Sequence, residues 1–131
     1  MRPATAAKTL RPPVQGYEVN RVERLLRRLA LSDERSLRSV LGGSAAELPG
    51  SGDLDAKAQA LVTLGALLSV GAGAVSLRWA VEHANAAGAT EDEVLGVLLA
   101  IAPAVGHARV VGVAPQLALA LGYDLEEADR R

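Results

Sequence analysis

Residues 58–77 form a run of 20 positions without a charged side chain, and this run constrains the fold more than any other feature. A transmembrane helix needs about 20 strongly apolar residues, but many positions here hold Ala, Gly, Ser or Thr. Gly71 and Gly73 also interrupt the run, and glycine weakens a helix interior. We therefore expect two buried helices of a globular domain separated by a short break, and no membrane-spanning segment.

The hydrophobic core has an unusual composition. Half of the 131 residues are hydrophobic, yet Phe is absent and Trp79, Tyr17 and Tyr123 are the only aromatic residues. The core must therefore be built from Ala, Leu and Val. Because the distance between packed helices depends on the side chains at their contact, we expect tight helix packing and no large aromatic-lined cavity.

Cysteine is absent from the sequence. Its absence excludes a disulfide framework, a zinc ribbon and a CxxC redox centre. The only histidines, His83 and His107, are 24 residues apart and lack ligand spacing, which argues against a metal site, and we expect no cofactor. The first residues lack the apolar stretch of a signal peptide, so the expected location is cytoplasmic.

Apolar residues recur at helical spacing, and no alternating strand pattern interrupts them. We therefore predict an all-α fold, a compact bundle of about six helices. Residues 1–16 are rich in proline and read as a flexible arm, residues 17–52 as an N-terminal helical extension, and residues 53–131 as the main helical domain. The predicted helices cover about 17–31, 33–42, 55–70, 74–87, 90–103 and 105–121.

The predicted helix over 56–70 is apolar on nearly all sides. Its apolar residues are Ala58, Leu61, Val62, Leu64, Leu67 and Leu68. A helix that is apolar all round is buried all round, and one small chain offers few such places. We therefore expect a homo-oligomer, in which a second copy supplies the missing cover.

Three motifs between residues 54 and 123 carry a resemblance to a known family. They are Leu54-Asp55-Ala56-Lys57, the corner Ala87-Gly88-Ala89-Thr90-Glu91-Asp92-Glu93-Val94, and Gly106-His107-Ala108-Arg109. Together they resemble the carboxymuconolactone decarboxylase family, which includes the alkylhydroperoxidase D proteins. The leader 22–25 and the ending 119–124 look like a cysteine-less actinobacterial branch. The resemblance covers about half of the chain and implies, for residues 53–131, an all-α fold that assembles as trimers or hexamers.

The chemistry of that family does not transfer to this sequence. Its peroxidase members carry Cys-x-x-Cys-x-x-x-His before the Gly-Ala-Thr corner, and these positions fall here on Gly73, Ser76 and Ala80. An upstream acid would fall near Ala60. A serine cannot cycle through sulfenic acid and disulfide, and an alanine cannot transfer a proton. The protein is therefore not expected to be a thiol peroxidase.

The helix over 74–87 holds four candidate site residues. His83 lies one turn after Trp79, so the two rings share a face and could form a pocket base with an aromatic wall, with Arg78 or Glu82 at the pocket mouth. The alternative is a histidine at the helix flank that packs on tryptophan. Arg78 and Glu82 could equally form a surface ion pair of little energetic weight.

The start of the last helix holds two further candidates. His107 could act as a general base, or it could be a capping or interface histidine. Arg109 could hold an anionic ligand. Glu91, Asp92 and Glu93, by contrast, occupy the first turn of a helix, where the helix dipole favours acids.

Charge is distributed unevenly along the chain. Residues 1–40 contain nine of the 14 basic residues and four acids, whereas the remainder contains five bases and 11 acids. An arginine-rich helix can bind nucleic acid, but this one lacks aromatic or glycine-rich interleaving, and the pI of the chain is about 6.1. Packing of this helix on the acidic half of its own or a neighbouring subunit is the better interpretation.

Two functions remain open. In the first, the chain is an enzyme of the decarboxylase-like family with a degenerate, non-thiol site. His83 or His107 would then be the general base, Arg78 or Arg109 would hold an anion, and the substrate would be a small carboxylated or carbonyl compound. In the second, the chain is a non-catalytic small-ligand-binding or assembly protein of the same fold.

Overall fold

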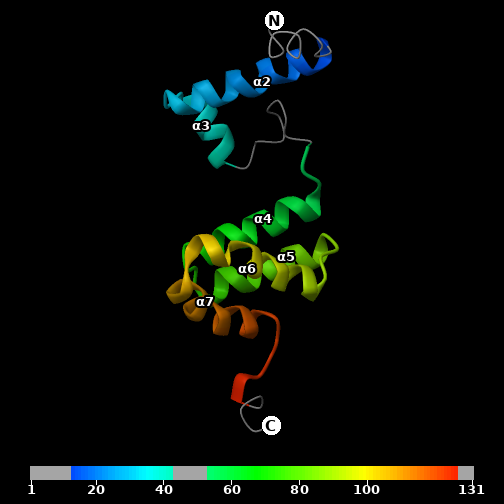
Figure 1. Ribbon diagram of the computed structural model, residues 1–131, viewed down its shortest axis with the longest axis vertical. Coiled ribbons are helices and arrows are strands. Elements are labelled where there is room, and N and C mark those ends of the chain that lie inside the picture. The colour runs from blue at the N-terminus through cyan, green and yellow to red at the C-terminus, as the bar shows by residue number, and fades with distance from the viewer. Residues whose placement is uncertain (1–12, 43–52, 127–131) are drawn as a thin grey trace, which may run out of the picture. The chain divides into compact units, whose positions relative to one another are not determined.

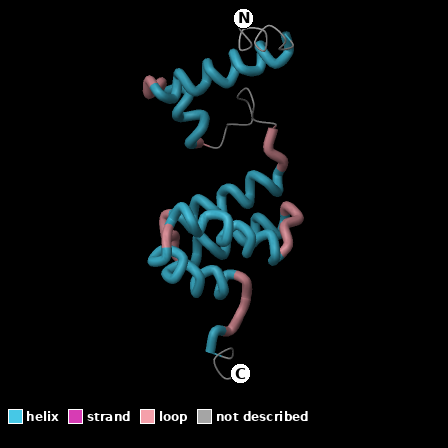
Figure 2. The backbone as a smooth tube through the Cα atoms, viewed as in Figure 1, coloured by secondary structure: helices cyan, strands magenta, loops and turns pink. Residues whose placement is uncertain are grey.

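The computed structural model describes residues 13–42 and 53–126 of the chain. Regular structure in these residues is helical throughout, without a strand (Figure 2), so the predicted all-α fold is confirmed. No helix within them is both long and apolar enough to cross a membrane. Residues 1–12 of the predicted arm and the glycine-rich segment 49–52 lie outside the described residues. The helices are α2 (Pro13–Ala30), α3 (Glu34–Leu41), α4 (Ala56–Ser69), α5 (Ala74–Ala86), α6 (Glu91–Val105) and α7 (His107–Ala120) (Figure 1).

Contacts divide the chain into two compact units, Met1–Asp53 and Leu54–Arg131. In the first unit α2 packs against α3. Helix α2 begins at Pro13, four residues before the predicted start, and proline suits a first helical turn because its fixed φ is already helical. Asp33 caps α3, because its carboxylate accepts hydrogen bonds from the backbone N–H of Ser36 at 3.0 Å and from its hydroxyl at 2.6 Å.

In the second unit, α4 packs against α5 and α6, and α7 packs against α5 and α6 (Figure 1). Every side chain of the main core is Ala, Leu or Val, as the composition predicts. Small and branched aliphatic side chains therefore make up this core. The buried core consists of Leu64, Leu68, Leu77, Ala80, Val81, Val94, Leu98, Val113 and Leu117.

Helix α4 is not buried on all sides within one chain. Leu64 and Leu68 face the core and are fully buried, but Val62 is 61 % exposed and Val70, at the helix end, is 72 % exposed. Helices α5 and α6 pack on α4, and they leave Val62 and Val70 exposed. Within the second unit, an apolar face of α4 therefore stays exposed.

Helix α6 corrects one predicted boundary. Pro103 was expected to end this helix, but the helix continues through it to Val105 and stops only at Gly106, whose φ is +85°. Proline removes one hydrogen-bond donor, to the carbonyl of Leu99. Leu99 is exposed, so water can supply the missing donor, and the helix tolerates Pro103 near its end. The separate helix α7 also contains a proline, Pro115.

We expect Leu64→Ala to destabilise the second unit by about 2–5 kcal/mol, because it removes a fully buried side chain and leaves a cavity. Leu64 is 0 % exposed. The free energy of unfolding, from chemical denaturation followed by circular dichroism, measures this cost. Leu54→Ala is the matched control, because half of the Leu54 side chain is exposed, and its cost should be several times smaller. Equal costs for the two variants would contradict this packing.

Candidate functional site

The turn between α5 and α6 depends on three small residues. Gly88 adopts a φ of +95°, which side chains with a Cβ rarely adopt. The next residue, Ala89, is buried with Ala60 and Ala84, and its N–H donates to the carbonyl of Ala84 at 2.9 Å. Thr90 then caps α6. The Gly-Ala-Thr sequence thus combines a positive φ, a close contact and a helix cap in consecutive positions.

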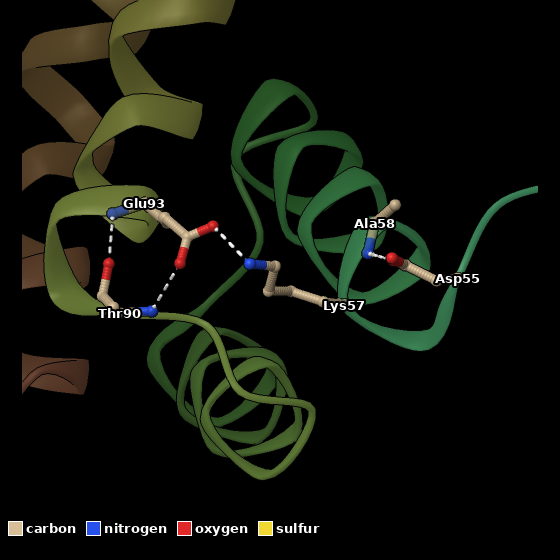
Figure 3. A network of polar contacts seen from close by, with 5 residues as sticks. All are labelled: Asp55, Lys57, Ala58, Thr90 and Glu93. Carbon is tan, nitrogen blue, oxygen red and sulfur yellow. Dashed lines mark hydrogen bonds and ion pairs between the residues drawn. The ribbon is translucent and has the colours of Figure 1, made fainter.

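Thr90 and Glu93 form a capping box at the start of α6. The Thr90 Oγ1 accepts from the Glu93 N–H, and a Glu93 carboxylate oxygen accepts from the Thr90 N–H, both at 3.1 Å. The second carboxylate oxygen of Glu93 pairs with Lys57 of α4 at 3.0 Å (Figure 3). The Lys57 ammonium and the Thr90 N–H lower the pKa of Glu93. The Glu93 carboxylate therefore caps the first turn of α6 and also connects α6 to α4.

A cleft of about 270 Å³ lies between the start of α6 and the end of α7, and we call it the α6–α7 cleft. Its walls are mostly apolar, and polar groups enter from the first turn of α6 and from Tyr123. Sequence reasoning missed this cleft. Its lining residues are Glu91, Asp92, Leu95, Leu98, Ala114, Leu117, Ala118, Leu121 and Tyr123.

Tyr123 connects the chain after α7 to the first turn of α6. Its hydroxyl donates a hydrogen bond of 2.7 Å to the Glu91 carboxylate, which lies 32 residues earlier in the chain. This hydrogen bond and the negative charge of Glu91 raise the pKa of Tyr123, because both favour the neutral phenol. Gly122, with a φ of +88°, turns the chain after α7, and Tyr123 follows this turn.

The predicted residues of α5 lie on its exposed surface. The rings of Trp79 and His83 are stacked, with centroids 5.3 Å apart and planes within 5°, which confirms that they share a helix face. Both residues are exposed, Trp79 to 55 %, and neither lines the α6–α7 cleft. Arg78 and Glu82 are also exposed, and within the described part of the chain the ion pairs do not include them.

The predicted residues of α7 lie away from the cleft. His107 and Arg109 are exposed in the first turn of α7. The cleft lining on this helix begins at Ala114, roughly 8–10 Å further along the helix axis at 1.5 Å per residue, and includes neither residue. The Arg109 guanidinium lies against Gly71, so a side chain at position 71 would collide with it. Gly71 precedes α5, and His83 lies near the end of α5. Within one chain, Arg109 and His83 are therefore not at one site.

No group of three potential His, Asp or Glu ligands comes together in the described parts of the chain. Comparisons with protein-family models, with curated proteins and with solved structures return no match. The family resemblance therefore depends on the sequence motifs alone.

We expect Glu91→Gln to lower the pKa of Tyr123 toward its ordinary value of 10.0, because the amide still accepts the hydrogen bond but no longer carries the charge that favours the neutral phenol. An ultraviolet absorbance titration in a Tyr17→Phe background isolates Tyr123, since the chain has two tyrosines. Asp53→Asn, at an exposed position outside the cleft lining, should leave the titration unchanged. An unaltered Tyr123 titration in Glu91→Gln would show that the hydrogen bond does not form in solution.

Proposed function

We propose that this chain is a carboxymuconolactone decarboxylase-like protein with a degenerate, non-thiol site, and that it binds a small organic ligand without converting it. The observation that supports this proposal most directly is the α6–α7 cleft. In the described structure, apolar walls and polar groups converge there, whereas the candidate bases lie elsewhere.

The positions that the resemblance assigns to proton transfer are closed. Ala80, at the position of the family's histidine, is 1 % exposed within the main core, and Ala60, near the position of the acid, is 2 % exposed. Gly73 and Ser76, at the cysteine positions, are exposed at the start of α5. Methyl groups thus fill the space where reactive side chains would sit, which supports binding over catalysis.

The cleft has the lining of a small-molecule site and a volume just below the usual range. Ligand pockets range from roughly 300 Å³ upward and combine apolar walls with a few polar groups, and a cavity of about 150 Å³ can hold benzene. The volume of about 270 Å³ therefore suits one ring or a short alkyl chain. Leu98 and Leu117 are buried and provide an apolar floor.

A second candidate function is the enzyme, acting on a small carboxylated or carbonyl compound. The stack of Trp79 on His83 favours it, because a fixed imidazole beside an aromatic wall is a suitable general base. Arg78 precedes Trp79 on the same helix and could hold the carboxylate. This site needs another subunit to cover it, since the face of α5 that carries both rings is exposed within one chain.

To test ligand binding, a fragment library can be screened by NMR chemical-shift changes in the full-length chain. We expect hits to shift the amides that line the α6–α7 cleft. Ala118→Leu should abolish these shifts, because the larger side chain fills the cleft from α7. Ala100→Leu is the matched control, since Ala100 is an exposed helical alanine outside the lining. Hits that shift the amides near His83 or His107 instead would favour the enzyme.

We also propose that the chain assembles with itself, as a trimer or hexamer. Exposed apolar side chains on α4, α6 and α7, among them Val62, Leu99 and Val111, support this proposal, because large exposed apolar patches mark protein–protein contacts and a second copy could cover these side chains. Light scattering at micromolar concentration should give an oligomeric mass, and Val62→Asp should lower it. Asn85→Asp, at an exposed position of α5, serves as the control. A monomeric mass for the unaltered protein would contradict assembly.

A further inference from the structure

We propose that the ligand of the α6–α7 cleft is a small hydrophobic cation, an amine that is protonated at neutral pH and attached to a short apolar group. This inference rests on the proposed function, because it assumes that the cleft binds a ligand. It adds the chemical class, which follows from the charge and the shape of the cleft.

The start of α6 carries an excess of negative charge. Three consecutive acids occupy this turn, and the Lys57 ammonium neutralises Glu93. No cation pairs with Glu91 or Asp92 in the described residues, and both line the cleft. The positive end of the α6 dipole offsets only about half an elementary charge. A net negative charge therefore remains at the cleft, and it attracts a cation.

Charged and apolar groups occupy separate parts of the cleft. Glu91 and Asp92 are exposed, whereas the buried Leu98 and Leu117 form the floor. A ligand with one charged end can keep its ammonium group hydrated beside the carboxylates while its apolar part covers the leucines. A fully polar ligand would leave the floor without an apolar partner.

The cleft is unsuited to a carboxylated ligand. A carboxylate in this cleft would lie beside Glu91 and Asp92, and like charges at short distance repel. The two arginines proposed to hold an anion do not line the cleft. The Tyr123 hydroxyl already donates to Glu91, so it is not free to compensate. The cleft thus selects against anions.

Three six-carbon probes test this inference: hexylamine, hexanol and hexanoate. At pH 7 an alkylamine is protonated and a carboxylic acid is ionised, so the three share an apolar chain and differ mainly in charge. We expect hexylamine to shift the cleft amides with the lowest Kd, hexanol to bind more weakly, and hexanoate to bind weakest. Added salt should weaken hexylamine binding and leave hexanol binding nearly unchanged.

Charge-removing variants identify the carboxylates involved. Glu91→Gln and Asp92→Asn should each raise the Kd of hexylamine roughly two- to fivefold, as loss of one exposed ionic contact implies. They should leave the Kd of hexanol unchanged. Asp53→Asn removes an exposed acid outside the cleft and should alter neither.

The outcomes separate the two proposals. If hexanol or hexanoate binds the cleft as tightly as hexylamine, or if the two variants leave the Kd of hexylamine unchanged, the cationic ligand is refuted and ligand binding stands. If no probe shifts the cleft amides, the ligand-binding function fails as well.

Discussion

The close contact of α4, α5 and the turn after α5 depends on alanine. Ala60, Ala84 and Ala89 meet in one buried cluster, and Ala80 lies in the larger core formed by leucine and valine. Because interiors pack without large voids, a bigger side chain at these places would push the helices apart. The same methyl groups occupy the positions where the family resemblance places a histidine and an acid. Close packing at these positions therefore requires side chains that cannot transfer a proton.

Polar contacts connect α4 to the start of α6. Lys57 of α4 holds Glu93, and Glu93 in turn holds the backbone N–H of Thr90 (Figure 3). These bonds fix the first turn of α6, which also contains Glu91 and Asp92. The ion pair is partly exposed, so its contribution to stability is small. The ion pair matters for position. It engages the Glu93 carboxylate, whereas Glu91 and Asp92 remain at the cleft.

Helices were predictable from this sequence because their signals are local. The apolar spacing along α4 and α5 predicted these helices correctly. Pro103 predicted the end of α6 wrongly, because the effect of a proline on a helix depends on solvent exposure. The stack of Trp79 on His83 followed from helical spacing, but the exposure of that face did not. The cleft was missed for a different reason. Glu91 and Tyr123 meet across 32 residues, and only the packing of α6 on α7 brings them together.

Under the proposed function, ligand binding and self-assembly are linked through α6. Leu95 lines the cleft, and Leu99, one turn further on, is 63 % exposed. Residues four apart lie on the same helix face, so the apolar wall of the cleft continues into the exposed apolar surface of α6. A second copy that covers Leu99 would lie next to the ligand. Coupling between two sites is reciprocal, so a ligand that stabilises the assembly must itself bind more tightly to the assembled protein.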